Sequence, residues 1–386
     1  MYGQIYQSGF NKYRNYVMYN QMVIEQDLPF VRGLKLKGVI AYDLKPIHKK
    51  IWKTPMPYYT VDMSSGSPKY VQAGSDGPEK PTYTQNYSEN QSLTLQGQIQ
   101  YNNTFGKHEV GGLVVFEMRD TQGDSFEASR LNYNVNIPEL NNGSSDPADI
   151  KNSGNSSKTK QRSIIYRVNY AYDGKYLFET SARYDGSYYF APDHRFGFFP
   201  SASIGWRISE ENFLKGRFNW LSNLKLRASY GESGALAADP FQYLSSYNLY
   251  SNSAVLNGKP TQGLSELLEP NKYITWEKAR KMDIGFDLGL LNNQISFSID
   301  YFSEYRSNML VKPQVTVPFE YGIGIAQENK GKMKNRGIEF SLNASNQFTK
   351  DFSAGLQVNF TYAKNKIVEI FETPATYNNP YRRQTR

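Results

Sequence analysis

The sequence predicts an all-β protein, an antiparallel transmembrane β-barrel, and three observations lead to that prediction. About twelve segments alternate apolar and polar residues, as strands with two different faces do. Most of them are about nine to fourteen residues long, which exceeds the ~5–6 residues usual in soluble sheets and fits a tilted strand that crosses a bilayer. Short turns and long polar segments alternate between them, as in an outer-membrane barrel.

The clearest hairpin signal lies between residues 164 and 184. Ile, Tyr or Val occupies every second position of residues 164–172, and Tyr, Phe, Thr or Ala does so in residues 176–184. These segments flank Asp173-Gly174, a pair that tolerates the positive φ angles of a two-residue hairpin turn. The same alternation predicts strands near residues 16–27, 34–45, 91–104, 108–119, 163–172, 175–186, 198–208, 223–231, 279–290, 294–306, 336–347 and 351–364.

The connections between these strands predict which rim faces which side. Short turns are expected near residues 29–33, 105–107, 173–174, 291–293 and 347–350. Long loops are expected over residues 46–90, 120–162, 187–197, 232–278 and 307–335. The linker at 209–222 is intermediate, and Ser209 is expected to cap a short helical turn there. Short turns belong to the periplasmic rim of such a barrel and long loops to the exterior.

Each predicted strand has one apolar face and one polar face. Ile284 and Phe286, for example, alternate with Asp283. The apolar face suits lipid, where an Arg or Lys at mid-depth would cost ~2–4 kcal/mol, and the polar face suits the lumen. We therefore expect a multi-pass protein of the outer membrane. The predicted aromatic girdle at the bilayer interface consists of Tyr184, Tyr230, Tyr301 and Tyr362.

Composition argues against several other classes of protein. The net charge is +8, but Lys and Arg are dispersed except for Arg382-Arg383, so we expect no nucleic-acid partner. No apolar segment reaches the ~20 residues that a membrane helix needs, and residues 1–30 do not read as a secretory signal. The chain contains no cysteine, which excludes thiol chemistry.

Catalytic and metal-binding motifs are incomplete. His108-Glu109 starts an H-E-x-x-H motif, but Gly112 stands where the second metal ligand would be. Asp283 and Asp287 resemble a glycosidase carboxylate pair, yet their alternation with glycine on a polar face indicates a barrel wall. We therefore predict no enzyme activity, no catalytic or metal-binding residue and no cofactor.

The long loops are the candidate binding elements. They combine aromatic rings with hydrogen-bonding groups, which suits sugar rings and peptides. The candidates for contact with such a substrate are Tyr188, Tyr189, His194, Arg195, Tyr243 and Tyr247. The alternative for each of them is that it only packs the loops together.

An ordered series of motifs resembles the SusC/RagA-type TonB-linked outer-membrane proteins of Bacteroidota, over about residues 90–370. The motifs are RYDGS (183–187), FAP (190–192), RFGFFPSASIGWRISEE (195–211), LSNLKLRASYG (221–231), WE (276–277), DIGFD (283–287), NRGIE (335–339) and KNKI (364–367). The resemblance implies a 22-stranded barrel with a plug domain, energised through TonB and lidded by a SusD-like surface lipoprotein. It implies uptake of glycan or peptide oligomers.

The chain departs from the full family pattern. We expect residues 1–386 to be one partial barrel domain of about twelve strands, without a plug, signal peptide or TonB box, so that TonB would act through a region N-terminal to it. One alternative is a smaller complete outer-membrane barrel acting as a porin or a membrane-embedded hydrolase. Another is a carbohydrate-binding protein, at the cell surface or soluble.

Overall fold

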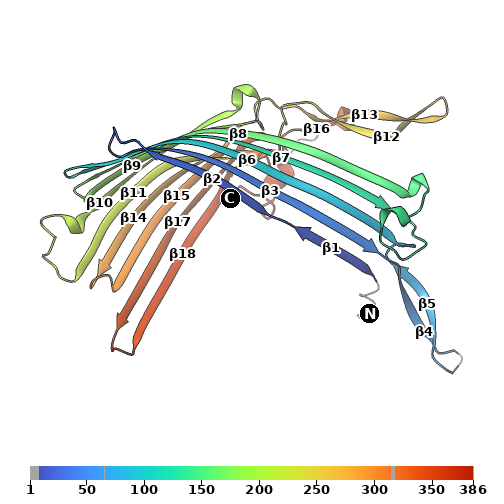
Figure 1. Ribbon diagram of the computed structural model, residues 1–386, viewed down its shortest axis with the longest axis horizontal. Helices are drawn as coiled ribbons and strands as arrows, with labels where there is room; N and C mark the ends of the chain where they lie inside the picture. The colour runs from blue at the N-terminus through green and yellow to red at the C-terminus, as the bar shows by residue number, and fades with distance from the viewer. Residues whose placement is uncertain (1–7, 65, 314–317, 386) are drawn as a thin grey trace. The chain divides into compact units, whose positions relative to one another are not determined.

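The computed structural model describes residues 8–64, 66–313 and 318–385, and their main element is an antiparallel sheet (Figure 1). The order of its neighbouring strands is β1-β3-β6-β7-β8-β9-β10-β11-β14-β15-β17-β18, with β2 also paired to β3. All twelve predicted strands are present. The strands of this sheet are β1 (Gly9–Asn15), β2 (Met18–Asp27), β3 (Leu34–Lys53), β6 (Thr82–Phe105), β7 (His108–Arg130), β8 (Ile150–Tyr172), β9 (Tyr176–Ser187), β10 (Phe196–Arg207), β11 (Leu221–Ala235), β14 (Glu277–Leu290), β15 (Ile295–Val311), β17 (Glu328–Gln347) and β18 (Ser353–Glu369).

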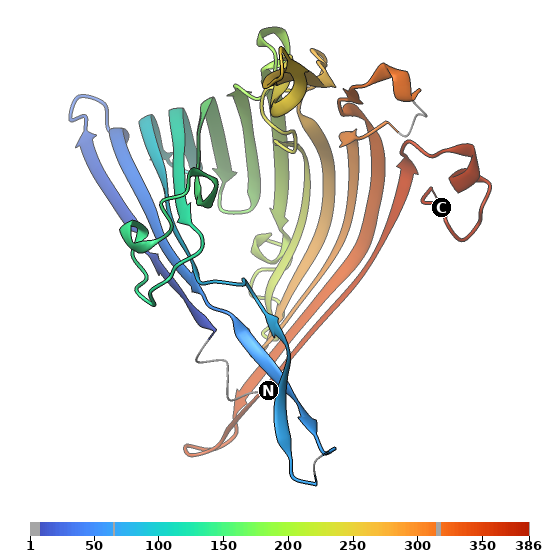
Figure 2. The same ribbon diagram turned by 90° about the vertical axis from the view of Figure 1, so that its right-hand side faces the viewer.

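The chain divides into two compact units. Of the described residues, the first comprises those within 8–23, 39–95 and 119–160, and the second those within 24–38, 96–118 and 161–385. A buried aromatic cluster in the first unit joins Trp52, Tyr83 and Tyr133, with the rings of Trp52 and Tyr133 edge to face at 4.9 Å. In the second unit, β14, β15, β17 and β18 run side by side (Figure 2).

The hairpin predicted at Asp173-Gly174 is confirmed. Asp173 has φ +52° and Gly174 has φ +64°, which are the positive angles of the turn that matches strand twist. The amide of Lys175 donates to the carbonyl of Tyr172 at 2.9 Å. The turn fixes the register of β8 and β9, in which Tyr172 lies opposite Tyr176 and Ile164 opposite Tyr184.

The two faces of the strands are also as predicted. Along β10, Ile204 is 61% exposed while Ser203 and Gly205 are half-buried, so the apolar side chains face outward. Across β14, β15 and β17 the rings of Phe286, Phe297 and Phe340 form a row, with centroids 6.3 Å and 5.0 Å apart. A face this apolar and this exposed is suited to a non-aqueous environment.

Several strands continue beyond their predicted ends. β3, β6, β7, β8, β15 and β17 extend into segments predicted as long loops. Period-2 alternation reveals a strand only where its two faces meet different media. Residues 151–158, for example, are polar or glycine and exposed on both faces, so no alternation marks them. Part of the loop predicted at 307–335, namely residues 314–317, lies outside the described residues.

The remaining long loops contain structure of their own. β4 (Met56–Asp62) pairs with β5 (Lys69–Asp76), and β12 (Ser246–Leu256) pairs with β13 (Lys259–Glu269), which meets β16 (Gly324–Ile325). Short helical turns are η2 (Leu140–Asn142), η3 (Pro147–Asp149), η4 (Pro192–His194), η5 (Ile208–Glu210), η6 (Phe319–Tyr321) and α1 (Pro374–Tyr377). None of the helical segments in the described part of the chain is long and apolar enough to span a bilayer.

The prediction that Ser209 caps a helical turn is wrong. The turn η5 begins at Ile208, so Ser209 lies inside it, and Arg207 occupies the capping position without a side-chain bond. The hydroxyl of Ser209 is buried and has no hydrogen-bond partner among the described residues.

Candidate functional site

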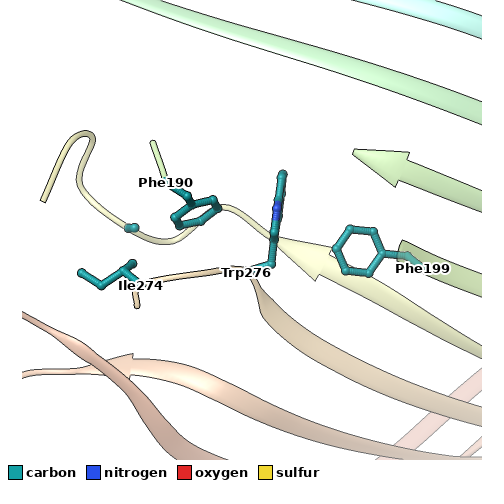
Figure 3. Close-up of a cluster of buried hydrophobic side chains, with 5 residues drawn as sticks. Phe190, Phe199, Ile274 and Trp276 are labelled. Atoms are coloured by element: carbon teal, nitrogen blue, oxygen red, sulfur yellow. The ribbon is translucent and has the colours of Figure 1, made fainter. Parts of the chain in front are cut away.

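A buried hydrophobic cluster joins two of the long loops, 187–197 and 232–278, to β10. Its members are Phe190, Phe199, Ala238, Ile274 and Trp276. The indole of Trp276 lies between two phenylalanine rings, 5.5 Å from Phe190 and 5.6 Å from Phe199 (Figure 3). Phe190 and Trp276 are 1% and 7% exposed, so they form a core for the loops instead of a binding surface.

Two glycines make room for this cluster. A Cβ at Gly234 would lie 2.1 Å from Cζ of Phe199, and one at Gly197 would lie 2.4 Å from the same atom. Such distances are far below van der Waals contact. Glycine at both positions therefore allows the Phe199 ring to lie on the polar face of the sheet and reach Trp276.

Hydrogen bonds fix the backbone around the cluster. The indole nitrogen of Trp276 donates to the carbonyl of Arg195 at 3.0 Å, and the hydroxyl of Thr275 donates to the carbonyl of His194 at 3.1 Å. The side-chain Nδ2 of Asn329 donates to the backbone carbonyls of Thr275 and Asn308 at 2.9 Å and 2.8 Å. Loop 188–195, residues 271–276 and the adjoining ends of β15 and β17 thus form one bonded assembly.

The structure places four of the six predicted binding residues in loop 188–195. The guanidinium of Arg195 lies 4.9 Å from the ring centroid of the exposed Tyr188, and its Nε donates to the carbonyl of Phe190. The His194 ring lies 5.9 Å from that of Tyr273. Tyr189 packs against the buried cluster, so its ring mainly stabilises the loop core and contributes little to the exposed loop surface.

The other two predicted residues lie apart from each other. Tyr243 is half-buried beside Phe241, with ring centroids 6.4 Å apart, and the amide of Phe241 donates to the carbonyl of Tyr189 at 3.3 Å. This segment therefore adjoins loop 188–195. Tyr247 is exposed on β12, opposite Glu266, and belongs to the separate β12–β13 hairpin.

A hollow of about 560 Å³ lies beside this assembly. Its lining residues are Glu269, Pro270, Asn271, Lys272, Tyr273, Ile325, Ala326, Glu328, Asn329 and Lys330. Tyr273 is 78% exposed, and the amide of Asn271 donates to the carbonyl of Gln327 at 2.8 Å. No periodic signal in the sequence marks this hollow, because its two lining segments come from loops more than fifty residues apart.

A second polar group lies on the polar face of the sheet. The guanidinium of Arg227 contacts Asp300 at 2.6 Å, Asp287 at 3.1 Å and Asp283 at 3.3 Å. Asp283 and Asp287, considered above as a carboxylate pair, are thus both bound to one cation. They act as parts of a polar wall.

The histidines of the incomplete metal motif and the loops have ordinary polar contacts. The Nδ1 of His108 lies 2.7 Å from the hydroxyl of Tyr170, and the Nε2 of His48 lies 3.5 Å from the amide of Gln85. Across the described ranges, no cluster of three or more His, Asp or Glu side chains has a metal-binding arrangement.

The comparisons with known proteins agree with the strand pattern. A family model described as "TonB dependent receptor-like, beta-barrel" matches residues 34–385. The TonB-dependent receptor P3 of Formosa agariphila is 29% identical over 303 residues, which cover 78% of this chain and 30% of that relative. The TonB-dependent receptor SusC of Bacteroides thetaiotaomicron is 35% identical over 210 residues, covering 54% of this chain and 21% of that relative. This chain spans less than a third of the length of these relatives.

Solved structures show the same fold. The RagAB peptide transporter superposes with a TM-score of 0.76 at 22% identity, over 94% of this chain and 39% of that chain. The siderophore receptor PirA from Acinetobacter baumannii superposes with a TM-score of 0.53 at 15% identity, over 92% of this chain and 45% of that chain. Both superpositions cover more than nine tenths of this chain.

Proposed function

The chain belongs to the TonB-dependent receptor β-barrel family, and from that premise we propose that it forms part of the wall of an importer for glycan or peptide oligomers. Its location is the outer membrane. The apolar strand faces then meet lipid, and the polar faces line the lumen. Residues 1–386 act in this proposal as one barrel domain.

The hollow beside loop 188–195 supports the choice of substrate class. It offers the exposed ring of Tyr273 next to the ammonium groups of Lys272 and Lys330 and the carboxylates of Glu269 and Glu328. An aromatic ring can stack on the C–H face of a sugar or on a peptide side chain, while the charged groups bind hydroxyls or peptide termini. We propose that Tyr188, His194 and Arg195 extend this surface, and that Tyr243 and Tyr247 flank it.

The proposal includes two partners and no catalysis. A SusD-like lipoprotein would cover the long loops, and TonB would supply energy through a part of the protein outside these residues. SusC and RagAB support this assignment as relatives of the same fold. Members of the family are receptors, and we propose that this chain binds its oligomer without altering it.

Calorimetry on the intact protein tests the proposal. We expect one class of a panel of oligosaccharides and oligopeptides to bind, and we expect Tyr273→Ala to weaken that binding about fivefold to a hundredfold, because a stacked aromatic ring contributes about 1–3 kcal/mol. Tyr70→Ala is the matched control, since Tyr70 is 72% exposed on the separate β4–β5 hairpin. Binding of neither class, or equal losses in both variants, would contradict the proposal.

A further inference from the structure

The short turns of the second unit form one continuous rim. They are 28–33, 106–107, 173–175, 208–220, 291–294 and 348–352. Backbone hydrogen bonds join Asp173 to Lys107 at 2.7 Å and Leu291 to Trp220 at 2.8 Å, each between two turns. Three further bonds join a turn to the end region of a neighbouring strand: Asn102 to Gly33 at 2.9 Å, Arg207 to Lys175 at 2.8 Å and Ser345 to Gln294 at 2.8 Å. The rim is therefore a surface of its own.

Exposed apolar side chains recur along this rim. Phe30 is 77% exposed in the first turn. The others, all exposed, are Phe105, Phe213, Phe218, Trp220, Leu291, Phe348 and Phe352. They lie at the ends of the apolar strand faces, where a bilayer changes from hydrocarbon to headgroup.

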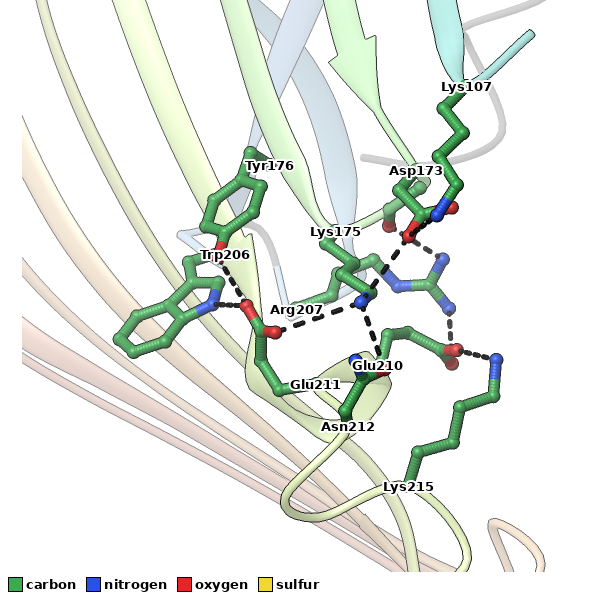
Figure 4. A network of polar contacts seen from close by, with 11 residues as sticks. Lys107, Asp173, Lys175, Tyr176, Trp206, Arg207, Glu210, Glu211, Asn212 and Lys215 are labelled. Carbon is green, nitrogen blue, oxygen red and sulfur yellow. Dashed lines mark hydrogen bonds and ion pairs between the residues drawn. The ribbon is translucent and has the colours of Figure 1, made fainter.

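The longest turn, 208–220, is fixed to the apolar side of the sheet. The carboxylate of Glu211 accepts from the hydroxyl of Tyr176 at 2.5 Å and from the indole of Trp206 at 3.0 Å (Figure 4). Both rings belong to the apolar face of β9 and β10. These two bonds hold the pKa of Glu211 below its ordinary range, so the anchor stays ionised at neutral pH.

The other carboxylates of the rim network are also engaged. Glu210 contacts Lys215 at 2.9 Å and Arg207 at 3.5 Å, and Asp173 contacts Lys107 at 3.1 Å (Figure 4). Each carboxylate in this network therefore already contacts a basic side chain, so none is left to form an ion pair with another basic residue of the rim.

Two arginines of the rim have no such partner. Among the described residues, neither Arg32 nor Arg217 contacts a carboxylate, and both are exposed. Arg32 lies two residues after Phe30, and Arg217 precedes Phe218, whose ring is 5.6 Å from that of Trp220. Each turn therefore presents a free guanidinium beside exposed aromatic rings.

We propose that this rim is a docking surface for anionic phospholipid headgroups, with Arg32 and Arg217 binding the lipid phosphates. Aromatic rings placed at the headgroup level and guanidiniums that bind phosphate in a bidentate manner are the groups that such a surface requires. The positive charges of Arg32 and Arg217, which no carboxylate neutralises among the described residues, complement the negative charge of the lipid.

Native mass spectrometry of the intact, detergent-purified protein tests this directly. Phosphatidylglycerol and phosphatidylcholine are titrated separately, and inorganic phosphate is added alone in a third arm. We expect phosphatidylglycerol to bind in preference, and Arg32→Gln with Arg217→Gln to reduce that binding about fivefold for each arginine removed. Inorganic phosphate alone should not bind detectably, because it lacks the acyl chains that place the headgroup beside the rings.

Matched variants separate a charge effect from a folding effect. Lys69→Gln with Lys259→Gln removes two exposed cations from the β4–β5 and β12–β13 hairpins and should leave lipid binding unchanged. Arg32→Lys with Arg217→Lys keeps the charge but loses the bidentate geometry, so it should retain part of the preference and bind more phosphatidylglycerol than the double glutamine variant. Equal binding of the two lipids, or an unchanged preference in the double glutamine variant, would overturn the proposal.

Discussion

Arg227 shows how single residues organise the polar wall. Its guanidinium is shared by three aspartates on two neighbouring strands. Gly285 makes this possible, because a Cβ there would lie 2.5 Å from Cζ of Arg227 and 2.4 Å from Oδ1 of Asp300. The sequence indicates a polar face at Asp283 and Asp287, but not this pairing. Arg227 lies 56 residues before Asp283, and no local pattern joins them.

Removing the Arg227 side-chain charge should destabilise the sheet. Arg227→Met leaves three carboxylates close together without a cation, and we expect a loss of about 1–3 kcal/mol, less than the 3–5 kcal/mol of a fully buried pair because the site is partly hydrated. Heat-modified electrophoretic mobility of the barrel would measure it as a lower unfolding temperature.

Neutralising the partners provides the control for that experiment. Adding Asp283→Asn, Asp287→Asn and Asp300→Asn to Arg227→Met removes the repulsion and should restore part of the loss. An unfolding temperature for Arg227→Met equal to that of the unsubstituted protein would contradict the role assigned to this cluster.

Strands and loops differ in how far the sequence predicts them. All twelve strands are found because one face of each is apolar and the other polar. The extension of β8 and the hairpin of β12 and β13 are missed because both faces of these segments are wet, which removes the alternation. The packing of Phe190 on Trp276 was not predicted either, because it joins residues 86 positions apart in the sequence. The sequence marks Trp276 only as part of the two-residue motif WE.

The loop assembly should loosen when the Trp276 bond is removed. Trp276→Phe keeps an aromatic ring in the cluster but deletes the donor to the Arg195 carbonyl. We expect faster amide hydrogen exchange in residues 188–195, because that carbonyl also accepts from Ser187 and so holds the loop base.

Trp52→Phe is the matched control for the Trp276→Phe experiment on loop 188–195. Trp52 is 5% exposed in the other aromatic cluster, so its substitution removes the same atoms in the other compact unit. Exchange in residues 188–195 that is unchanged by Trp276→Phe, or equally changed by Trp52→Phe, would show that the indole bond does not hold the loop.

The strands of the second unit form a barrel wall with two chemically different rims. The short-turn rim carries exposed Phe and Trp beside Arg and Lys. The opposite rim carries the loop assembly and the β12–β13 hairpin. An outer-membrane wall requires these rims to lie on opposite sides of the bilayer, with the short turns in the periplasm.

Cysteine labelling measures this sidedness most directly, because the chain contains no cysteine of its own. Lys259→Cys places one thiol at the start of β13, and Lys350→Cys places one in the turn between β17 and β18. With a membrane-impermeant maleimide, we predict labelling of Lys259→Cys on intact cells and of Lys350→Cys only after the outer membrane is permeabilised. Labelling of Lys350→Cys on intact cells would contradict the account.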